Sequence, residues 1–200
     1  MISIGLIAII ATLSSLVSDT ARNAFVTTST STKLEAQVKT TLDRVAIEFE
    51  MAVAGTLDPD LTGLFSDTSS ISMQQVVDLD EGVIVLGTVT TISFQRDPAD
   101  AADGVDNDGD GLVDEGRLVM VRNDGEANST SVTLCKNVGR FLEGEDDGNG
   151  DENGNGLVNE PGFLIQRDGN LITLQLTLEE ADGSGQLTTR TSTTSVNLRN

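Results

Sequence analysis

The first 17 positions form an apolar run, MISIGLIAIIATLSSLV, and no charged residue occurs before Asp19. Such a run is about as short as a membrane-spanning helix can be, which is roughly 17 residues. It lacks the basic segment and the small-residue cleavage site of an ordinary secretory signal peptide. A buried core helix would share this pattern, but an N-terminal anchor fits it better.

An amphipathic pattern follows this run directly. Apolar residues recur at steps of three or four and therefore share one face of a helix. They are Leu34, Val38, Leu42, Val45, Phe49 and Val53. No proline precedes Pro59, and no glycine lies between Gly5 and Gly55. The pattern predicts one nearly continuous helix of about 53 residues, about 80 Å long at 1.5 Å per residue, so part of it must project from any small domain.

Two stretches of this helix are rich in Ser, Thr and Asn, at residues 14–23 and 26–32. Their side chains can take backbone hydrogen bonds away from a helix. We therefore expect the helix to be unwound or strained there, above all in residues 14–23.

From about residue 80 onward, apolar and polar positions alternate, which is the period of a half-buried β-strand. The segments with this character are residues 82–96, 117–122, 129–138, 162–167, 171–180 and 187–198. RDGN, at 167–170, is typical of a tight hairpin turn, and RNDGEANS, at 122–129, predicts a longer hairpin loop. The expected fold class is α+β. A long helix, residues 1–55, projects from and packs on an antiparallel β-sheet head, residues 56–200.

The N-terminal helix and the head differ in net charge. The chain has 12 Lys and Arg against 32 Asp and Glu, a formal net charge of −20, and it has no His. Residues 1–57 contain four basic and five acidic residues, so the remaining residues contain eight and 27, a net charge of −19. Such a surface argues against nucleic acid as a partner and favours cations. Without His, acid–base catalysis lacks its commonest group. Cys135 is the only cysteine and lies in a strand-like segment, without any His to activate it. We therefore do not expect this protein to be an enzyme.

Two acidic loops repeat one spacing at an offset of 45 residues, DNDGDGLVDEG at 106–116 and DENGNGLVNEP at 151–161. A D-x-[DN]-x-[DN]-G stretch wraps side-chain oxygens and one backbone carbonyl around Ca²⁺, which takes 6–8 oxygen ligands. We predict a calcium loop at 103–116 and another at 147–161. The ligands predicted for the first are Asp106, Asp108, Asp110 and the Leu112 carbonyl, with Asp103, Asp114 or Glu115 as candidates to complete it. Those for the second are Asp151, Asn153, Asn155 and the Leu157 carbonyl, with Glu160 and either Asp147 or Asn149.

These loops are not EF-hands. The bidentate Glu that ends an EF-hand loop would fall at Arg117 in the first loop and at Gly162 in the second. Neither loop is flanked by helical patterns, so closure must come from other residues. The alternative is a solvated acidic loop without metal, but that alternative does not explain the repeated GLV-[DN]-E tail.

The layout of the chain resembles that of type IV pilins and type II secretion pseudopilins. In that family a leader is removed, and the mature chain begins with an uncharged helix that becomes amphipathic and packs on an antiparallel sheet. MISIGLIAII stands at the mature start, with Met1 in the place of the methylated first residue. LDRVAIEFEMA, at 42–52, and the ending TSVNLRN resemble segments of J-type and W-type minor pilin-like proteins. Gly5 departs from the family, because most members have a Glu there that pairs with a neighbouring subunit's amino terminus.

The resemblance implies a structural subunit of an extracellular type IV pilus-like filament. The subunit would pass through an inner-membrane-anchored precursor and then form a helical homopolymer at the cell surface through its N-terminal helix. One alternative is a minor, J-type pseudopilin at the tip of a type II secretion or pilus machine, which Gly5 favours. Another is a membrane-anchored, calcium-dependent adhesin, although the scarcity of aromatic residues, six Phe only, argues against a sugar-stacking site.

Overall fold

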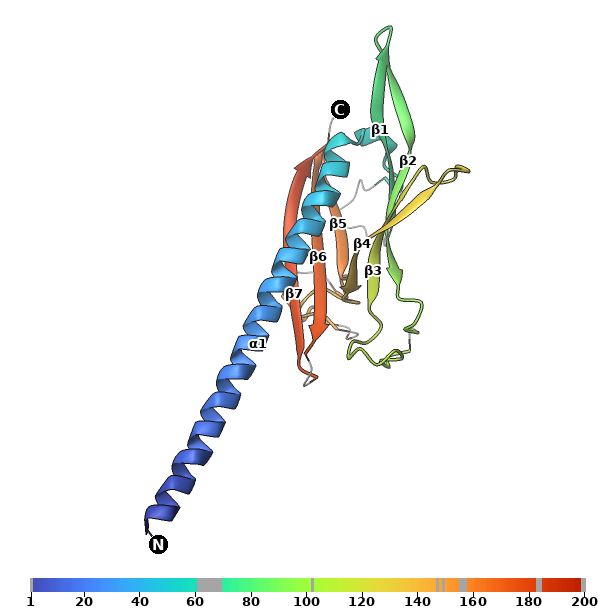
Figure 1. Cartoon of the computed structure of the whole chain (residues 1–200). Helices are drawn as coiled ribbons and strands as arrows, with labels where there is room; N and C mark the ends of the chain where they lie inside the picture. The colour runs from blue at the N-terminus through green and yellow to red at the C-terminus, as the bar shows by residue number, and fades with distance from the viewer. Residues whose placement is uncertain are drawn as a thin grey trace.

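The computed structural model contains a long helix and a seven-stranded sheet within the residues that it describes (Figure 1). These are residues 2–60, 70–101, 103–146, 148, 150–154, 158–182 and 185–198, with side chains from residue 13 onward. The elements are α1 (Ile2–Met51), the 3-10 turn η1 (Ala54–Thr56), β1 (Ser70–Asp80), β2 (Val83–Arg96), β3 (Gly116–Arg122), β4 (Thr130–Val138), β5 (Phe163–Asp168), β6 (Leu171–Ala181) and β7 (Leu187–Asn197). All of these strand pairings are antiparallel. The predicted α+β class, with a helix packed on an antiparallel sheet, is confirmed.

Helix α1 is continuous over 50 residues. The prediction that it is unwound in residues 14–23, or in the second Ser/Thr-rich stretch, is therefore wrong. Thr20 donates its hydroxyl hydrogen to the Leu16 carbonyl at 2.8 Å. Thr28 does the same to the Ala24 carbonyl, also at 2.8 Å. Because these bonds run back along the helix, the hydroxyl groups are satisfied without displacing the backbone ladder.

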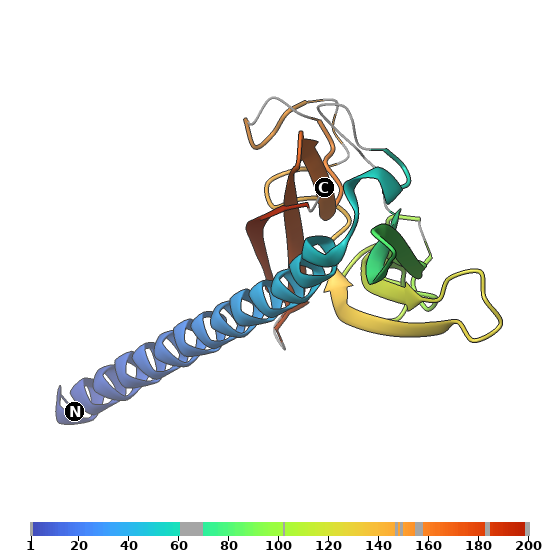
Figure 2. The same cartoon turned by 90° about the horizontal axis from the view of Figure 1, so that it is seen from above.

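The second half of α1 packs on the sheet through the apolar stripe predicted from the sequence. Five of its six positions are buried, namely Leu34, Val38, Leu42, Val45 and Phe49. The sixth, Val53, lies beyond the end of α1, where its backbone N–H donates to the Gln74 carbonyl. The stripe packs mainly on β6 and β7. Seen from above, β5–β7 and β1–β4 lie on two sides of the C-terminal end of α1, so the helix end fills the space between them (Figure 2).

The first half of α1 projects away from the head (Figure 1). Leu13, Leu16, Val17 and Phe25 are all exposed there. Within the described residues, we find no helix that combines the length and the apolar character needed to cross a membrane.

The sheet consists of two groups of strands that meet at one residue pair. Strands β1 to β4 pair in chain order, and β6 pairs with both β5 and β7. The groups join where Val138 of β4 pairs with Leu178 of β6, and both of these residues are buried. Since β7 pairs along the whole of β6, strands β5 and β4 share the other edge of β6.

The predicted hairpins are present, but one strand is not anticipated by the sequence pattern. Residues 167–170 form the turn between β5 and β6, and residues 122–129 form the loop between β3 and β4. Strand β1 has no regular alternation, because its pairing with β2 shifts register on both sides of Val76. Each shift moves the following side chains to the other face, which hides the period of two.

The two acidic loops connect strands at the same end of the head. Residues 97–115 join β2 to β3, and residues 139–162 join β4 to β5. This end points toward the projecting half of α1, whereas the turn between β1 and β2 lies at the opposite end (Figure 1). The topology therefore brings together two loops that are far apart in the sequence.

Replacing Phe49 by Ala is expected to destabilise the head by about 3–5 kcal/mol, because the change removes a fully buried ring and leaves a cavity. Ile47→Ala is the matched control, since Ile47 lies on the same helix and is 53% exposed. Urea unfolding followed by circular dichroism measures both losses. Equal losses in the two variants would contradict the packing described here.

Candidate metal centre

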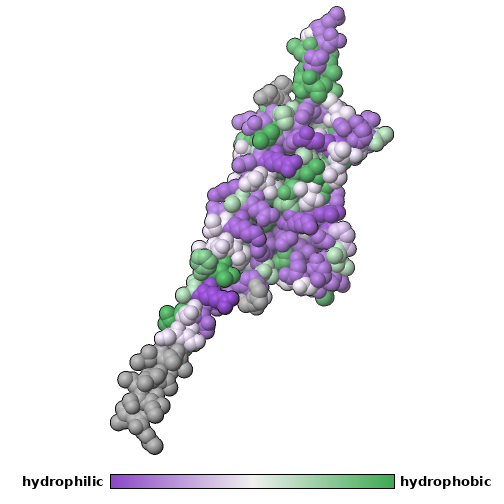
Figure 3. Space-filling view, in the orientation of Figure 1, coloured by the Kyte–Doolittle hydropathy of each residue, from purple (hydrophilic) through white to green (hydrophobic). Residues whose placement is uncertain are grey.

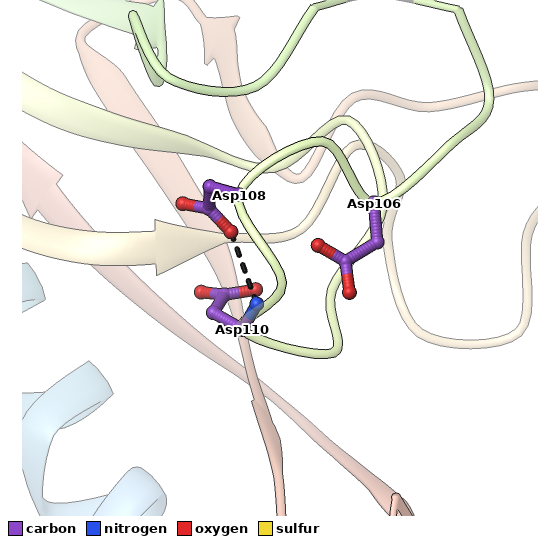
Figure 4. Close-up of side chains that lie close together, drawn as sticks. All are labelled: Asp106, Asp108 and Asp110. Carbon is purple, nitrogen blue, oxygen red and sulfur yellow. Dashed lines mark hydrogen bonds between the residues drawn. The ribbon is translucent and has the colours of Figure 1, made fainter.

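Three aspartates of the loop between β2 and β3 gather their carboxylates around one space (Figure 4). One oxygen each from Asp106, Asp108 and Asp110 lies within 4.8 Å of the other two. Ca²⁺ binds oxygen at roughly 2.3–2.6 Å, so a single ion could contact oxygens at that separation. The predicted ligands at the first, third and fifth loop positions are therefore close enough to share an ion.

Two glycines allow the loop to turn around Asp106. The Asp106 carboxylate accepts hydrogen bonds from the backbone N–H groups of Gly109 at 2.6 Å and Gly111 at 2.9 Å. These glycines have φ angles of 80° and 90°, in the left-handed region where a side chain causes strain. A Cβ on Gly111 would also lie 2.7 Å from the Cβ of Ala181, so the loop rests against the end of β6.

The other two aspartates extend the same turn toward the core. The backbone N–H of Asp110 donates to the Asp108 carboxylate at 3.1 Å, the bond drawn in Figure 4. The backbone N–H of Leu112 donates to the Asp110 carboxylate at 2.9 Å. The Leu112 side chain is buried and attaches the loop to the head, whereas its neighbour Val113 is exposed.

Asp114, one of the candidates for closing the first loop, is already fully engaged as a structural residue. It is buried, and one of its oxygens accepts the backbone N–H groups of Asp103 at 3.0 Å and Gly104 at 3.1 Å. The other oxygen accepts from Arg140 at 3.0 Å. Because Arg140 belongs to the second acidic loop, this ion pair joins the two loops. The Asp103 carboxylate is likewise used locally, since it accepts from the N–H of Val105 at 3.0 Å.

Two further carboxylates lie buried beside the aspartate cluster, Asp100 and Glu115, and each residue is only 3% exposed. One oxygen of Asp100 accepts the backbone N–H of Asn107 at 2.9 Å. The other Asp100 oxygen and one Glu115 oxygen are buried without a hydrogen-bond partner. A buried polar atom without a partner is costly, and a buried charge costs more. The two carboxyl groups also interact with each other, so either a shared proton or a bound cation would satisfy these oxygens.

The electrostatics of Glu115 connect this pair to the cluster. Burial is the largest cause that raises the pKa of Glu115, and together with the negative charges of Asp110 and Asp100 it brings this pKa to about 7. The pKa of Asp100 is lowered, chiefly by the N–H that Asn107 donates to it. Glu115 thus stands among anionic neighbours that disfavour its charged form, and a bound cation would reverse that effect.

Two described positions of the second loop have the same backbone conformation as their counterparts in the first. Asp114 has a φ of 55° and Asn159, 45 positions later, has 57°, although few non-glycine residues adopt positive φ. Gly109 and Gly154 correspond in the same way, at 80° and 76°. At these two positions, the sequence repeat is accompanied by a repeated backbone conformation.

The described part of the second loop contains only some of its predicted ligands. Asp147, Asn149, Asn155 and Leu157 lie outside the described residues. Glu160, the counterpart of Glu115, is buried, while Asp151 and Asn153 are exposed. Within the described residues, the acidic side chains close enough to share an ion are Asp106, Asp108 and Asp110 of the first loop.

Sequence reasoning missed Asp100, although a signal for it exists. Extending the repeat upstream at the same offset aligns Asp100 with Glu145, so both loops begin with an acid at that place. The Glu145 carboxylate accepts the backbone N–H groups of Asn153 at 3.1 Å and Asn159 at 2.9 Å. The acid at this position thus organises the following loop in both copies of the repeat.

In calcium-free buffer, the raised pKa of Glu115 should make the protein lose stability as the pH rises. Its ordinary value is 4.5 and its folded value is about 7, so the folded state binds the proton more tightly. The resulting stabilisation is complete below pH 4.5 and is lost by pH 7, on the order of 3 kcal/mol at about 1.4 kcal/mol per pKa unit. Urea unfolding across this range should show the loss in the native chain but not in Glu115→Gln. Parallel stability curves would contradict the assignment.

We compared the chain with known families and proteins. No family model matches it. No curated protein and no solved structure matches it either.

Proposed function

We propose that this protein is a structural subunit of an extracellular filament of the type IV pilus kind, assembled through α1 and stabilised by calcium in its head. The observation that carries the proposal is the division of α1 into two parts. Residues 34–49 contribute a buried stripe to the head, whereas residues 13–26 present apolar side chains to solvent. A helix that the chain's own head covers only in part needs neighbours for the remainder.

The exposed part of α1 has the pattern of a packing surface. Leu13, Val17, Ala21 and Phe25 follow one another at steps of four and lie on one face. Val17 is 69% exposed and Phe25 is 75% exposed, and both are large enough to fill grooves on another helix. Burial of apolar area contributes about 25 cal/mol per Å², so a bundle of identical helices would gain many kcal/mol per subunit.

A tip position in such a machine is a second candidate, and Gly5 is the residue that favours it. Most pilin-like subunits carry Glu at that place, and the resemblance implies that tip subunits lack it more often. Abundance separates the two roles. A filament subunit is present along the whole length of purified filaments, whereas a minor pseudopilin is present only at their ends.

The calcium part of the proposal is supported by two independent features of the first loop. One is the aspartate cluster of residues 106–110, and the other is the pair of buried carboxylates Asp100 and Glu115. With the Leu112 carbonyl, these groups supply the all-oxygen ligand set that Ca²⁺ prefers over softer ligands. The proposed ion offsets the repulsion among the acids and fixes the loop between β2 and β3. Through Asp114 and Arg140, the same ion would also hold the second loop in place.

We propose a second calcium ion in the loop at 147–161, because this loop repeats the ligand spacing of the first at an offset of 45 residues. Two of its three spaced ligands, Asn153 and Asn155, are neutral amides where the first loop has Asp108 and Asp110. Fewer charged ligands weaken Ca²⁺ binding. The first loop is therefore the tighter site.

Removing calcium from the full chain should lower its melting temperature. An ion that binds only the folded state stabilises it by about 2.7 kcal/mol when its concentration is 100 times Kd. Asp108→Asn combined with Asp110→Asn should remove part of this gain, and Mg²⁺ should replace Ca²⁺ poorly because it requires tighter octahedral geometry. Calorimetric titration and thermal unfolding with and without chelator measure these effects.

The matched control carries Asp78→Asn and Asp80→Asn, since these acids lie on the β1–β2 hairpin at the opposite end of the head. It should respond to calcium as the native chain does. Glu115→Gln gives a sharper test, because it should stabilise the calcium-free protein while weakening calcium binding. An unchanged melting temperature in chelator, with no heat on calcium addition, would refute the metal centre.

Filament formation should depend on the exposed face of α1. Leu16→Asp together with Val17→Asp places charges on that face and should abolish filaments in electron micrographs while leaving the unfolding of the head unchanged. Deletion of residues 1–25 should have the same effect. Leu187→Asp is the control, because Leu187 is also exposed, at 51%, but belongs to β7. Filaments from the truncated chain would rule out assembly through α1.

A further inference from the structure

The Asn-Gly pairs of this chain all lie in the second acidic loop, at residues 149–150, 153–154 and 155–156. No asparagine elsewhere in the sequence precedes a glycine. Of the three pairs, the structure describes both residues of Asn153–Gly154, whereas Asn149 and Asn155 lie outside the described residues. The pair at 153–154 is therefore the one whose surroundings can be judged.

Asn153 and Gly154 lie at the surface of the head, and both are exposed. A Cβ added to Gly154 would meet no described atom within 4 Å, so the space beside this residue is open. Figure 3 shows that hydrophilic residues predominate at the end of the head that holds the acidic loops. Water therefore reaches the peptide bond that joins the two residues.

A glycine after an asparagine favours a reaction within the chain itself. Because glycine has no Cβ, its backbone nitrogen can approach the preceding side chain with little steric hindrance. The Gly154 nitrogen forms a bond to the amide carbon of Asn153, and the side-chain NH2 group leaves as ammonia with the proton from that nitrogen. One water then opens the succinimide ring. Opening at one carbonyl gives Asp, and opening at the other gives isoaspartate.

We propose that Asn153 is a site of spontaneous deamidation, in which water converts a neutral amide of the second loop into a carboxylate. The first loop shows that the Asp product fits this backbone. The counterpart of Asn153–Gly154 is Asp108–Gly109, and the two glycines have φ angles of 76° and 80°. Isoaspartate adds one carbon to the main chain instead, which breaks the spacing that the two loops share.

Asn107 of the first loop is an internal reference. It is also exposed, but Asp108 follows it and hinders the backbone nitrogen with a side chain. Its own amide donates hydrogen bonds to the Asp103 carboxylate at 2.9 Å and to the Val105 carbonyl at 2.7 Å. Asn107 should therefore deamidate far more slowly than Asn153, although both belong to acidic loops of one repeat.

The effect of the modification on calcium rests on the proposed function, whereas the reaction itself needs only water. The Asp product gives the second loop one more charged ligand, and the affinity for Ca²⁺ depends on the number of charged ligands. We expect calcium binding by that loop to become tighter, on the order of tenfold. The isoaspartate product should weaken it, because the lengthened backbone no longer places the ligands around one point.

Timed incubation of the full chain in mildly alkaline, calcium-free buffer tests the site. Trypsin cleaves after Arg140 and Arg167, so one peptide contains all three Asn-Gly pairs, and its fragment masses locate the modified residue. Product should accumulate at Asn153 and not at Asn107. In the urea-unfolded chain all three pairs should react, which shows that the method detects them. A folded chain in which Asn153 reacts no faster than Asn107 would overturn the proposal.

Two variants separate the modification from its effect on calcium. Asn153→Gln should remove the product at this position, because its side chain is one methylene too long for the five-membered ring. Asn153→Asp reproduces the Asp product and should bind calcium more tightly than the native chain in calorimetric titration. Product at Asn153 without calcium heat from either the native chain or Asn153→Asp would refute the calcium sites and support the deamidation. Calcium heat that is equal in both would contradict the proposed effect on affinity.

Discussion

Burial of one apolar stripe of α1 against the sheet is the interaction on which the other features depend. The stripe spans residues 34–49, and two ion pairs lie beside it. Glu48 is buried and receives hydrogen bonds from Arg122 of β3 and Gln75 of β1. Lys33 pairs with Glu180 of β6 at 2.8 Å. Since both groups of strands hold the helix, its orientation relative to the head is set on two sides.

The same packing leaves the molecule with two unlike ends. One end holds the acidic loops and the exposed half of α1, and the other holds the hairpin of β1 and β2 (Figure 1). A head with a net charge of −19 beyond residue 57 repels copies of itself. In the proposed filament, apolar contacts through α1 would bypass this acidic surface.

Charge also explains why a cation is the expected partner of the head. Asp100 and Glu115 place two carboxylates beside Asp110 in a part of the head closed to water. Without a cation, the fold must protonate one of them or bear the cost of a buried charge. The Asp114–Arg140 pair cannot relieve this, because both Asp114 oxygens already accept hydrogen bonds from the protein. A calcium ion would neutralise the cluster and link two loops whose positions the strands have already fixed.

The sequence by itself determined the features that depend on local periodicity. The stripe of α1, most of the strands, the hairpins at 122–129 and 167–170 and the aspartate spacing of residues 106–110 are all readable, because side chains three, four or two positions apart share a face whatever the tertiary structure is. The predicted interruption of α1 is wrong, since the Thr20, Thr28 and Thr32 hydroxyls each have a carbonyl partner inside the helix. Tertiary structure alone decided the rest. Register shifts hid β1, and the folding of the loop turned Asp114 into a structural anchor and buried Asp100 beside Glu115, because burial and partners are set by contacts between segments that are distant along the chain.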